Sequence, residues 1–139
     1  MISPYPVICS RKFAETVNFY EDFFGYVPLS EYPDYCVMEH PQTGARLAIV
    51  AYTYDGIPQD YRRPVQGMIL EFPVEDVQGT FDALYMEGVD LITDIEVAIR
   101  GIPYFMARDP YNDILIKISN LSLSQELDQK FRSGAQATA

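Results

Sequence analysis

The sequence is short of several residue types, and each shortage narrows what the chain can do. It has 139 residues, no tryptophan, one histidine (His40) and two cysteines (Cys9 and Cys36). A Ser-His or Cys-His nucleophilic pair would have to be built around His40, which adjoins a turn and is expected to face solvent. No apolar run approaches the ~20 residues of a membrane-spanning helix, and the first residues lack the pattern of a signal peptide. We therefore expect a cytoplasmic protein with free, buried thiols, in which Cys9 packs and does not act as a nucleophile.

Basic residues are scarce as well. Ten Lys and Arg residues face twenty Asp and Glu residues, which gives a net charge of −10. Nucleic-acid binding usually needs a basic face, so this class of partner is excluded. The acidic excess serves either solubility or attraction of a cationic ligand. The glycines stand singly, so no phosphate-binding glycine loop is present. Aromatic residues are plentiful instead, with 11 Tyr and 8 Phe.

The two halves of the chain repeat one pattern of elements. In the first half, an expected strand "YPVICS" precedes a helix over Phe13–Phe24, whose apolar residues fall three or four apart on one face. "DYCVMEH" and "ARLAIVAY" then predict a hairpin. In the second half, "GMILEFPV", a helix and the pair "GIPYFMA" and "ILIKI" follow the same order, and Gly25 and Gly88 end the two helices. A further strand is expected at 89–97, more clearly than at "VPLSEY" in the first half.

These halves are expected to be diverged copies of one strand–helix–strands unit. We expect one domain over residues 1–119, with module one at 1–52 and module two at 67–119. Between them, residues 53–66 contain two prolines, a glycine and mixed charges, a composition typical of a linker.

Residues 120–139 differ from the rest by their polar composition. Apolar residues at a spacing of four, Leu123, Leu127 and Phe131, predict a short amphipathic helix that Asn120 or Ser122 can cap. The final segment "SGAQATA" is expected to be frayed.

Two short segments carry a resemblance to a known family. "NFYEDFFGY" (18–26) ends the first helix, and "RDPYND" (108–113) forms the turn before the last strand. Together with the duplication, they resemble the vicinal oxygen chelate superfamily, which includes glyoxalase I, extradiol dioxygenases, fosfomycin resistance proteins and bleomycin resistance proteins. Asn112 stands where the family usually has a glycine. The resemblance implies an α+β fold of two βαβββ modules, which form a curled mixed sheet around a cleft with the helices outside.

Metal-dependent members of this superfamily bind an ion through His, Gln or Glu ligands on the first and last strands of each module. Carried over to this chain, these positions fall on Tyr5, Ile69 and Ile116, with the fourth near Leu47. These side chains do not supply the nitrogen and carboxylate ligands that a divalent ion needs. The resemblance therefore points to the metal-free, bleomycin-resistance-like members, and we expect neither a metal nor another cofactor.

Side-chain alternation along the strands identifies the residues expected to line the cleft. Glu71 is the one charge in "MILEFPV", so it should either pair with Arg108 or take part in ligand binding or acid–base chemistry. The tyrosines either pack or form an aromatic wall for a flat or cationic ligand. The candidate ligand-binding residues are Tyr5, Tyr35, Glu39, Ile69, Glu71, Tyr104, Met106, Arg108 and Ile116.

Three functions follow as hypotheses. The first is a homodimeric protein that binds and sequesters an amphipathic or cationic compound, similar to the bleomycin resistance proteins. The second is a metal-independent lyase or isomerase that uses Glu71 as the base and a tyrosine as the acid. The third is an interaction module with a vestigial cleft. None of the three has a nucleic-acid or membrane partner.

Overall fold

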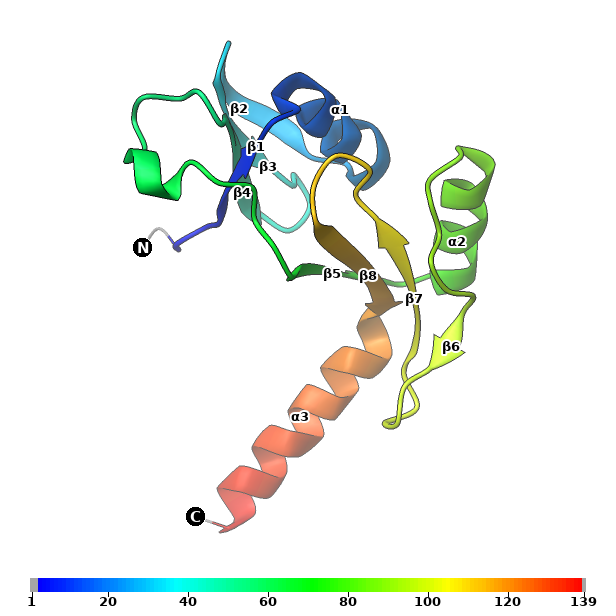
Figure 1. The fold of residues 1–139 in the computed structure, drawn as a ribbon. Coiled ribbons are helices and arrows are strands. Elements are labelled where there is room, and N and C mark those ends of the chain that lie inside the picture. The colour runs from blue at the N-terminus through cyan, green and yellow to red at the C-terminus, as the bar shows by residue number, and fades with distance from the viewer. Residues whose placement is uncertain (1–2, 139) are drawn as a thin grey trace. The chain divides into compact units, whose positions relative to one another are not determined.

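The computed structural model describes residues 3–138, which divide into two compact units (Figure 1). The first unit comprises the residues up to 68 together with 109–114, and the second comprises 69–108 together with the residues from 115 onward. The elements in chain order are β1 (Val7–Ser10), α1 (Phe13–Phe24), β2 (Val27–Tyr32), β3 (Tyr35–Glu39), β4 (Arg46–Ala51), the 3₁₀ turn η1 (Gln59–Tyr61), β5 (Met68–Val74), α2 (Val77–Met86), β6 (Glu96–Val97), β7 (Pro103–Arg108), β8 (Ile114–Asn120) and α3 (Leu121–Thr138).

The first unit contains a four-stranded sheet in the order β1-β4-β3-β2. β1 runs parallel to β4, and the other neighbouring strands are antiparallel. Ile8, Ile49 and Cys36 stand side by side on neighbouring strands and are buried. α1 contacts β1 and β4, because the apolar stripe of an amphipathic helix needs a surface to cover. Gly25 ends α1 at a left-handed φ of 74°, which residues with a side chain rarely adopt.

The second unit repeats this arrangement. Its sheet has the order β5-β8-β7-β6, which is the first order with each strand replaced by its counterpart. α2 begins after Asp76, whose Oδ1 accepts a hydrogen bond from the Gly79 N–H at 2.9 Å. The helix contacts β7, where the ring of Phe81 packs edge-on against Phe105 with centroids 5.1 Å apart. The predicted α+β fold is confirmed, with two open four-stranded sheets that are consistent with two βαβββ modules.

The copies diverge most in the outer strand of each sheet. β2 has six residues, whereas β6 has two, so the expectation that 89–97 would be the clearer strand is wrong. In that segment, Leu91 forms an isolated bridge with Ala107, and the N–H groups of Ile92 and Thr93 both bond to the carbonyl of Met106. The segment therefore follows β7 without building a regular ladder.

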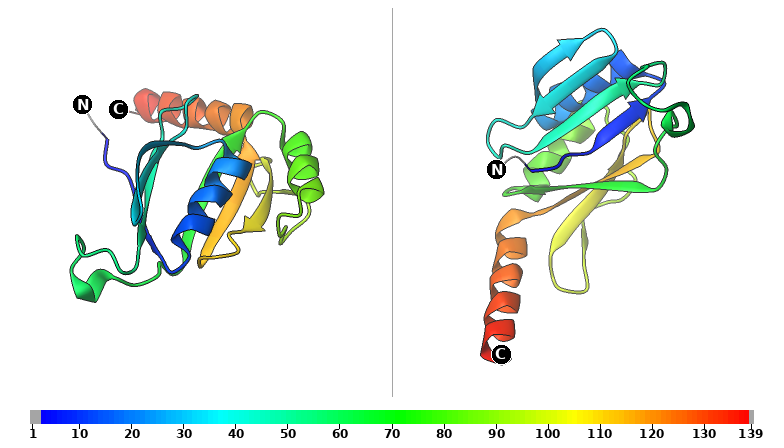
Figure 2. Two further views of the ribbon diagram at one scale, coloured as in Figure 1. Left: turned by 90° about the horizontal axis from the view of Figure 1, so that it is seen from above. Right: turned by 90° about the vertical axis from the view of Figure 1, so that its left-hand side faces the viewer.

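The C-terminal helix is longer than the sequence predicts. Asn120 caps it as expected, since its Oδ1 accepts the Leu123 N–H at 2.8 Å. The helix continues to Thr138, so the tail expected to fray from residue 133 is helical through 138, and Ala139 lies outside the described residues. α3 follows β8 directly as one straight helix (Figure 2). Within residues 3–138, no helix is long and apolar enough to cross a membrane.

A buried hydrogen-bond network joins the "RDPYND" turn to α1 inside the first unit. The Asp109 carboxylate is 1% exposed and accepts hydrogen bonds from the Tyr20 hydroxyl at 2.7 Å and from the backbone N–H groups of Tyr111 and Asn112. The Asn112 side chain donates both to Asp109 and to the Thr16 hydroxyl. The turn therefore holds α1 in place, and Asn112 uses the side chain that a glycine would lack.

Candidate functional site

α1 covers one face of the first sheet, and the other face is open along β3 but buried along β4, where Ala48 and Val50 are 0% exposed. Along β3, Cys36 and Met38 are buried, whereas Tyr35, Val37 and Glu39 alternate with them and are half-buried. This is the alternation that the sequence predicts, because successive side chains on a strand point to opposite faces. The open face of β3 is therefore the place to look for a ligand site in this unit.

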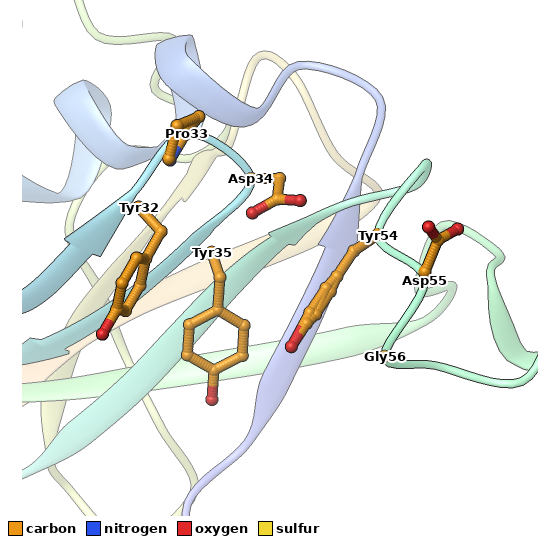
Figure 3. A pocket seen from close by; sticks show the side chains of 7 residues that line it. All are labelled: Tyr32, Pro33, Asp34, Tyr35, Tyr54, Asp55 and Gly56. Carbon is orange, nitrogen blue, oxygen red and sulfur yellow. The ribbon is translucent and has the colours of Figure 1, made fainter.

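A hollow of about 520 Å³ opens at the β2–β3 end of this face (Figure 3). The rings of Tyr32, Tyr35 and Tyr54 extend to the same side, and the Asp34 carboxylate lies near the backbone ends of Tyr35 and Tyr54, away from their hydroxyl groups. The Asp55 carboxylate points away from the rings. The lining residues are Tyr32, Pro33, Asp34, Tyr35, Tyr54, Asp55 and Gly56.

The hollow is aromatic and carries charge of one sign. Its lining includes two carboxylates and no basic residue. Outside the lining, the Arg62 guanidinium lies 3.8 Å from the fully exposed Asp55 carboxylate and partly offsets that charge. Asp34 is left as the main negative charge of the lining, and a lining of tyrosines with a carboxylate favours a cationic or amphipathic ligand.

Hydrogen bonding among the tyrosines extends this surface toward the N-terminal strand. The rings of Tyr35 and Tyr54 are 5.4 Å apart between centroids. Burial raises the pKa of Tyr35, and a hydrogen bond with Tyr5 and the neighbouring Tyr54 raise it further. Tyr5 also lines a second hollow of about 500 Å³, together with the ion pair between Arg46 Nε and Glu39 Oε1 at 3.2 Å. The structure thus brings the predicted Tyr5, Tyr35 and Glu39 together on one face.

The open face of the second sheet has a different character. Glu71 accepts a hydrogen bond from the Ser119 hydroxyl at 2.8 Å, and its other oxygen lies 3.8 Å from the Lys117 ammonium. The same ammonium stands over the Tyr104 ring, 5.0 Å from its centroid, as a cation–π contact. Tyr104 donates its hydroxyl to Glu96 at 3.0 Å. Positive and negative groups therefore partner each other across this face.

Two sequence-based assignments for the second sheet are wrong. Ile116 does not share the face of Glu71: it is fully buried and pairs in register with the buried Ala107, on the side where Phe105 meets α2. The strand presents Lys117 on the open face instead. Glu71 also does not pair with Arg108, whose guanidinium lies 3.8 Å from Asp90. Of the other predicted residues of this sheet, Tyr104 and Met106 are half-buried beside the buried Phe105, and Ile69 is exposed between half-buried neighbours.

His40 is less exposed than the sequence predicts. It is half-buried, with its ring edge-on against Tyr26 at 5.7 Å between centroids, and its Nδ1 accepts the Gln42 N–H at 3.3 Å. Its role is therefore to pack against the end of α1 and to fix the turn that follows β3. Cys9 is buried as expected, and burial raises the pKa of its thiol more than nearby Arg62 lowers it, so the thiol stays protonated and unreactive.

The residues at the four ligand positions do not suit a metal ion. Leu47 and Ile116 are buried and apolar, Ile69 is an exposed hydrocarbon, and Tyr5 is the sole oxygen donor of the set. In the described part of the chain, no three His, Cys, Asp or Glu side chains gather closely enough to bind a metal. Among the described acid–base groups, Tyr104 donates its hydroxyl to Glu96, whereas Glu71 accepts a hydrogen bond from Ser119.

Sequence reasoning missed six of the seven lining residues, namely Tyr32, Pro33, Asp34, Tyr54, Asp55 and Gly56. They lie at the end of β2, in the turn after it and in the linker, where no periodicity fixes the direction of a side chain. The glycine in "YDG" was the available signal, and the structure explains it: a Cβ atom at residue 56 would collide with the Tyr54 ring. The glycine allows the backbone to pass directly against this ring.

Two βαβββ modules in one chain are the architecture that the sequence resemblance implies, and comparisons with known proteins identify the same superfamily. The family model described as Glyoxalase/Bleomycin resistance protein/Dioxygenase superfamily matches residues 3–118. The chain belongs to this superfamily. A sequence search of curated proteins finds no match.

Solved structures share the fold at low sequence identity. An integron cassette protein from Vibrio cholerae is 21% identical, with a TM-score of 0.67 over 86% of this chain and 96% of that chain. A virulence protein from Salmonella typhimurium is 17% identical, with a TM-score of 0.69 over 86% and 98%. A glyoxalase/bleomycin resistance protein/dioxygenase family enzyme from Burkholderia phytofirmans is 18% identical, with a TM-score of 0.69 over 84% and 96%. At these identities the likeness describes the fold alone.

Proposed function

We propose that this protein is a metal-free binder of an amphipathic or cationic small molecule, which it sequesters in the manner of a resistance protein. The observation that carries the proposal is the hollow of about 520 Å³ whose lining combines three tyrosines with two carboxylates and no basic residue. Its size is within the range of small-molecule sites. The superfamily includes proteins named for bleomycin resistance, and the unsuitable ligand positions support the metal-free part of the proposal.

The physical basis is the pairing of a cation with ring faces and one carboxylate. A cation over a tyrosine ring gains about 0.5–2 kcal/mol, depending on how much water is removed. Asp34 adds charge attraction within the lining, while Arg62 opposes the approach of a cation on the Asp55 side. We therefore expect Asp34 to contribute more to affinity than Asp55.

A matched pair of probes tests the proposal. Benzyltrimethylammonium and its uncharged carbon analogue neopentylbenzene have nearly the same shape, so their affinities, measured by titration calorimetry or NMR, isolate the effect of charge. We expect the cation to bind more tightly, and the Asp34→Asn substitution to weaken it about three- to thirtyfold, a change of roughly 0.7–2 kcal/mol. Tyr54→Leu should weaken both probes.

The control is Asp22→Asn, which removes an equal charge from an exposed position on α1. Equal affinity for the two probes, or cation binding that Asp34→Asn and Asp22→Asn change alike, would contradict a specific cation site. About one equivalent of zinc, iron, nickel or manganese per purified chain would contradict the metal-free part.

A further inference from the structure

α3 lies outside the part of the chain that the family shares. The family model ends at residue 118, and the solved relatives are covered over 94–98% of their length while covering about 86% of this chain. α3 begins three residues after that end and runs for 18 residues. None of its described side chains is buried: Leu123 is 38% exposed, Phe131 is 78% exposed and Leu127 is half-buried.

A helix of this kind needs a covering surface. Isolated helices of this length are marginal in water, and Ser, Asp and Gly, all present in α3, are weak helix formers. Leu123, Leu127 and Phe131 lie four residues apart and therefore form one narrow apolar stripe. Burial of this stripe against another surface would supply the stability that the helix propensities of its residues do not.

The charges beside the stripe indicate what covers it. On one flank Glu126 lies four residues before Lys130, and their side chains form an ion pair at 3.5 Å. Asp128 and Arg132 repeat the same order and spacing toward the other flank. When two such helices pair antiparallel, each flank meets its own copy in reverse, so contacts between acids and bases outnumber those between like charges. In a parallel pair the two flanks exchange, and like-charge contacts, such as Glu126 with the partner's Asp128, become the more numerous.

We propose that α3 pairs antiparallel with α3 of a second copy of this chain, about a two-fold axis near Gln129. This register places Leu127 against the partner's Phe131 and brings Glu126 close to the partner's Lys130. The pairing of α3 goes beyond the proposed function, because no residue of α3 lines the ligand hollow. The flanking charges cancel, which gives no attraction to an anionic membrane, the alternative surface for an amphipathic helix.

Analytical ultracentrifugation of the full chain over a concentration series tests the pairing. The wild type is expected to form a dimer of two 15.9 kDa chains. Leu127→Glu places a charge in the stripe and should raise the dissociation constant at least about tenfold. Gln125→Glu adds the same charge on the opposite side of the helix and should change it little. Circular dichroism establishes that both variants retain the sheets.

The orientation is tested by exchanging charges. Lys130→Glu alone puts like charges together and should weaken the dimer several-fold, whereas Glu126→Lys with Lys130→Glu restores opposite charges and should recover it. A carbodiimide cross-link between Glu126 and Lys130 that joins ¹⁴N- and ¹⁵N-labelled chains would show the antiparallel contact directly. A monomeric wild type, a dimer that Leu127→Glu leaves intact, or a monomer that floats with anionic phospholipid vesicles would each overturn the proposal.

Discussion

The two modules share a strand order but present different open faces. The first face carries a hollow of tyrosines and carboxylates, with negative charge that its own lining does not balance. On the second, Lys117 pairs with Glu71, Tyr104 with Glu96 and Arg108 with Asp90. Duplication has kept the topology, while the exposed side chains of the strands have diverged. In such a fold a few residues on the open faces decide the function, and here they make the first module the better candidate for a ligand site.

The modules also differ in how they hold their helices. α2 relies on an apolar contact, with Phe81 edge-on against Phe105. α1 is additionally bound by the buried network of Tyr20, Thr16, Asp109 and Asn112. Because buried polar groups are costly once a partner is lost, the first module should be much more sensitive to single polar substitutions than the second.

The largest effect is expected from Asp109→Ala. The substitution leaves the Tyr20 hydroxyl, two backbone N–H groups and the Asn112 amide without their buried acceptor. We expect the free energy of unfolding to fall by roughly 3–5 kcal/mol, measured by urea denaturation. Asp113→Ala, at an exposed position of the same turn, is the control and should cost less than about 0.5 kcal/mol. Similar losses for both variants would mean that the network does not hold α1.

Alkaline pH should also destabilise the first module more than the second, with a smaller loss of unfolding free energy than Asp109→Ala causes. Burial and the adjacent Asp109 carboxylate raise the pKa of Tyr20 far above its usual value, and burial also raises the pKa of Tyr26 and Tyr35. A tyrosine with a raised folded-state pKa keeps its proton while the unfolded chain has already lost it. Stability is therefore fully present below about pH 10 and falls as the pH rises, by up to about 1.4 kcal/mol per pH unit for each such group.

Urea denaturation between pH 8 and pH 11.5 measures this slope. Tyr20→Phe should lose less unfolding free energy between pH 8 and pH 11.5 than the wild type does, each protein being compared with its own value at pH 8. Tyr104→Phe is the matched change in the second module and should alter the slope less, because the pKa of Tyr104, raised chiefly by its hydrogen bond to Glu96, is shifted less than that of the deeply buried Tyr20. A slope that neither substitution alters would place the alkaline sensitivity elsewhere.

The sequence predicted the repeated architecture well, because long periodic segments carry their own evidence. α1 spans the predicted Phe13–Phe24, and alternation gave the correct face for Tyr35, Val37 and Glu39. It failed on β8, where the face of every side chain depends on where the strand begins after the "RDPYND" turn. The resemblance placed Ile116 at a ligand position in the cleft, but a shift of one residue exchanges the two faces of a strand, and Lys117 lies on the open face instead.

The remaining errors have a different cause. Whether 89–97 pairs along its length depends on contacts with β7 that no local pattern encodes, and β6 is limited to two residues. Tyr54 and Asp55 lie in an irregular linker, where a composition of turn residues predicts a loop but not the direction of its side chains. Of the seven residues that line the candidate hollow, the sequence therefore identified only Tyr35, and the other six were found in three dimensions.

The smallest effect concerns Glu71, for which the sequence offered two partners. Its ion pair with Lys117 is partly exposed, with 47% of the Glu71 side chain accessible, so it should contribute less than about 1 kcal/mol. A double-mutant cycle of Glu71→Gln and Lys117→Met, by urea denaturation, is expected to show a positive coupling within that limit. The cycle of Glu71→Gln with Arg108→Gln should be additive within about 0.3 kcal/mol, since Arg108 pairs with Asp90. Coupling to Arg108 and none to Lys117 would restore the pairing first expected from the sequence, and would leave Lys117 as an uncompensated cation on the second face. In that case the contrast between the two faces would be one of charge sign, and the second module would become a candidate site for an anion.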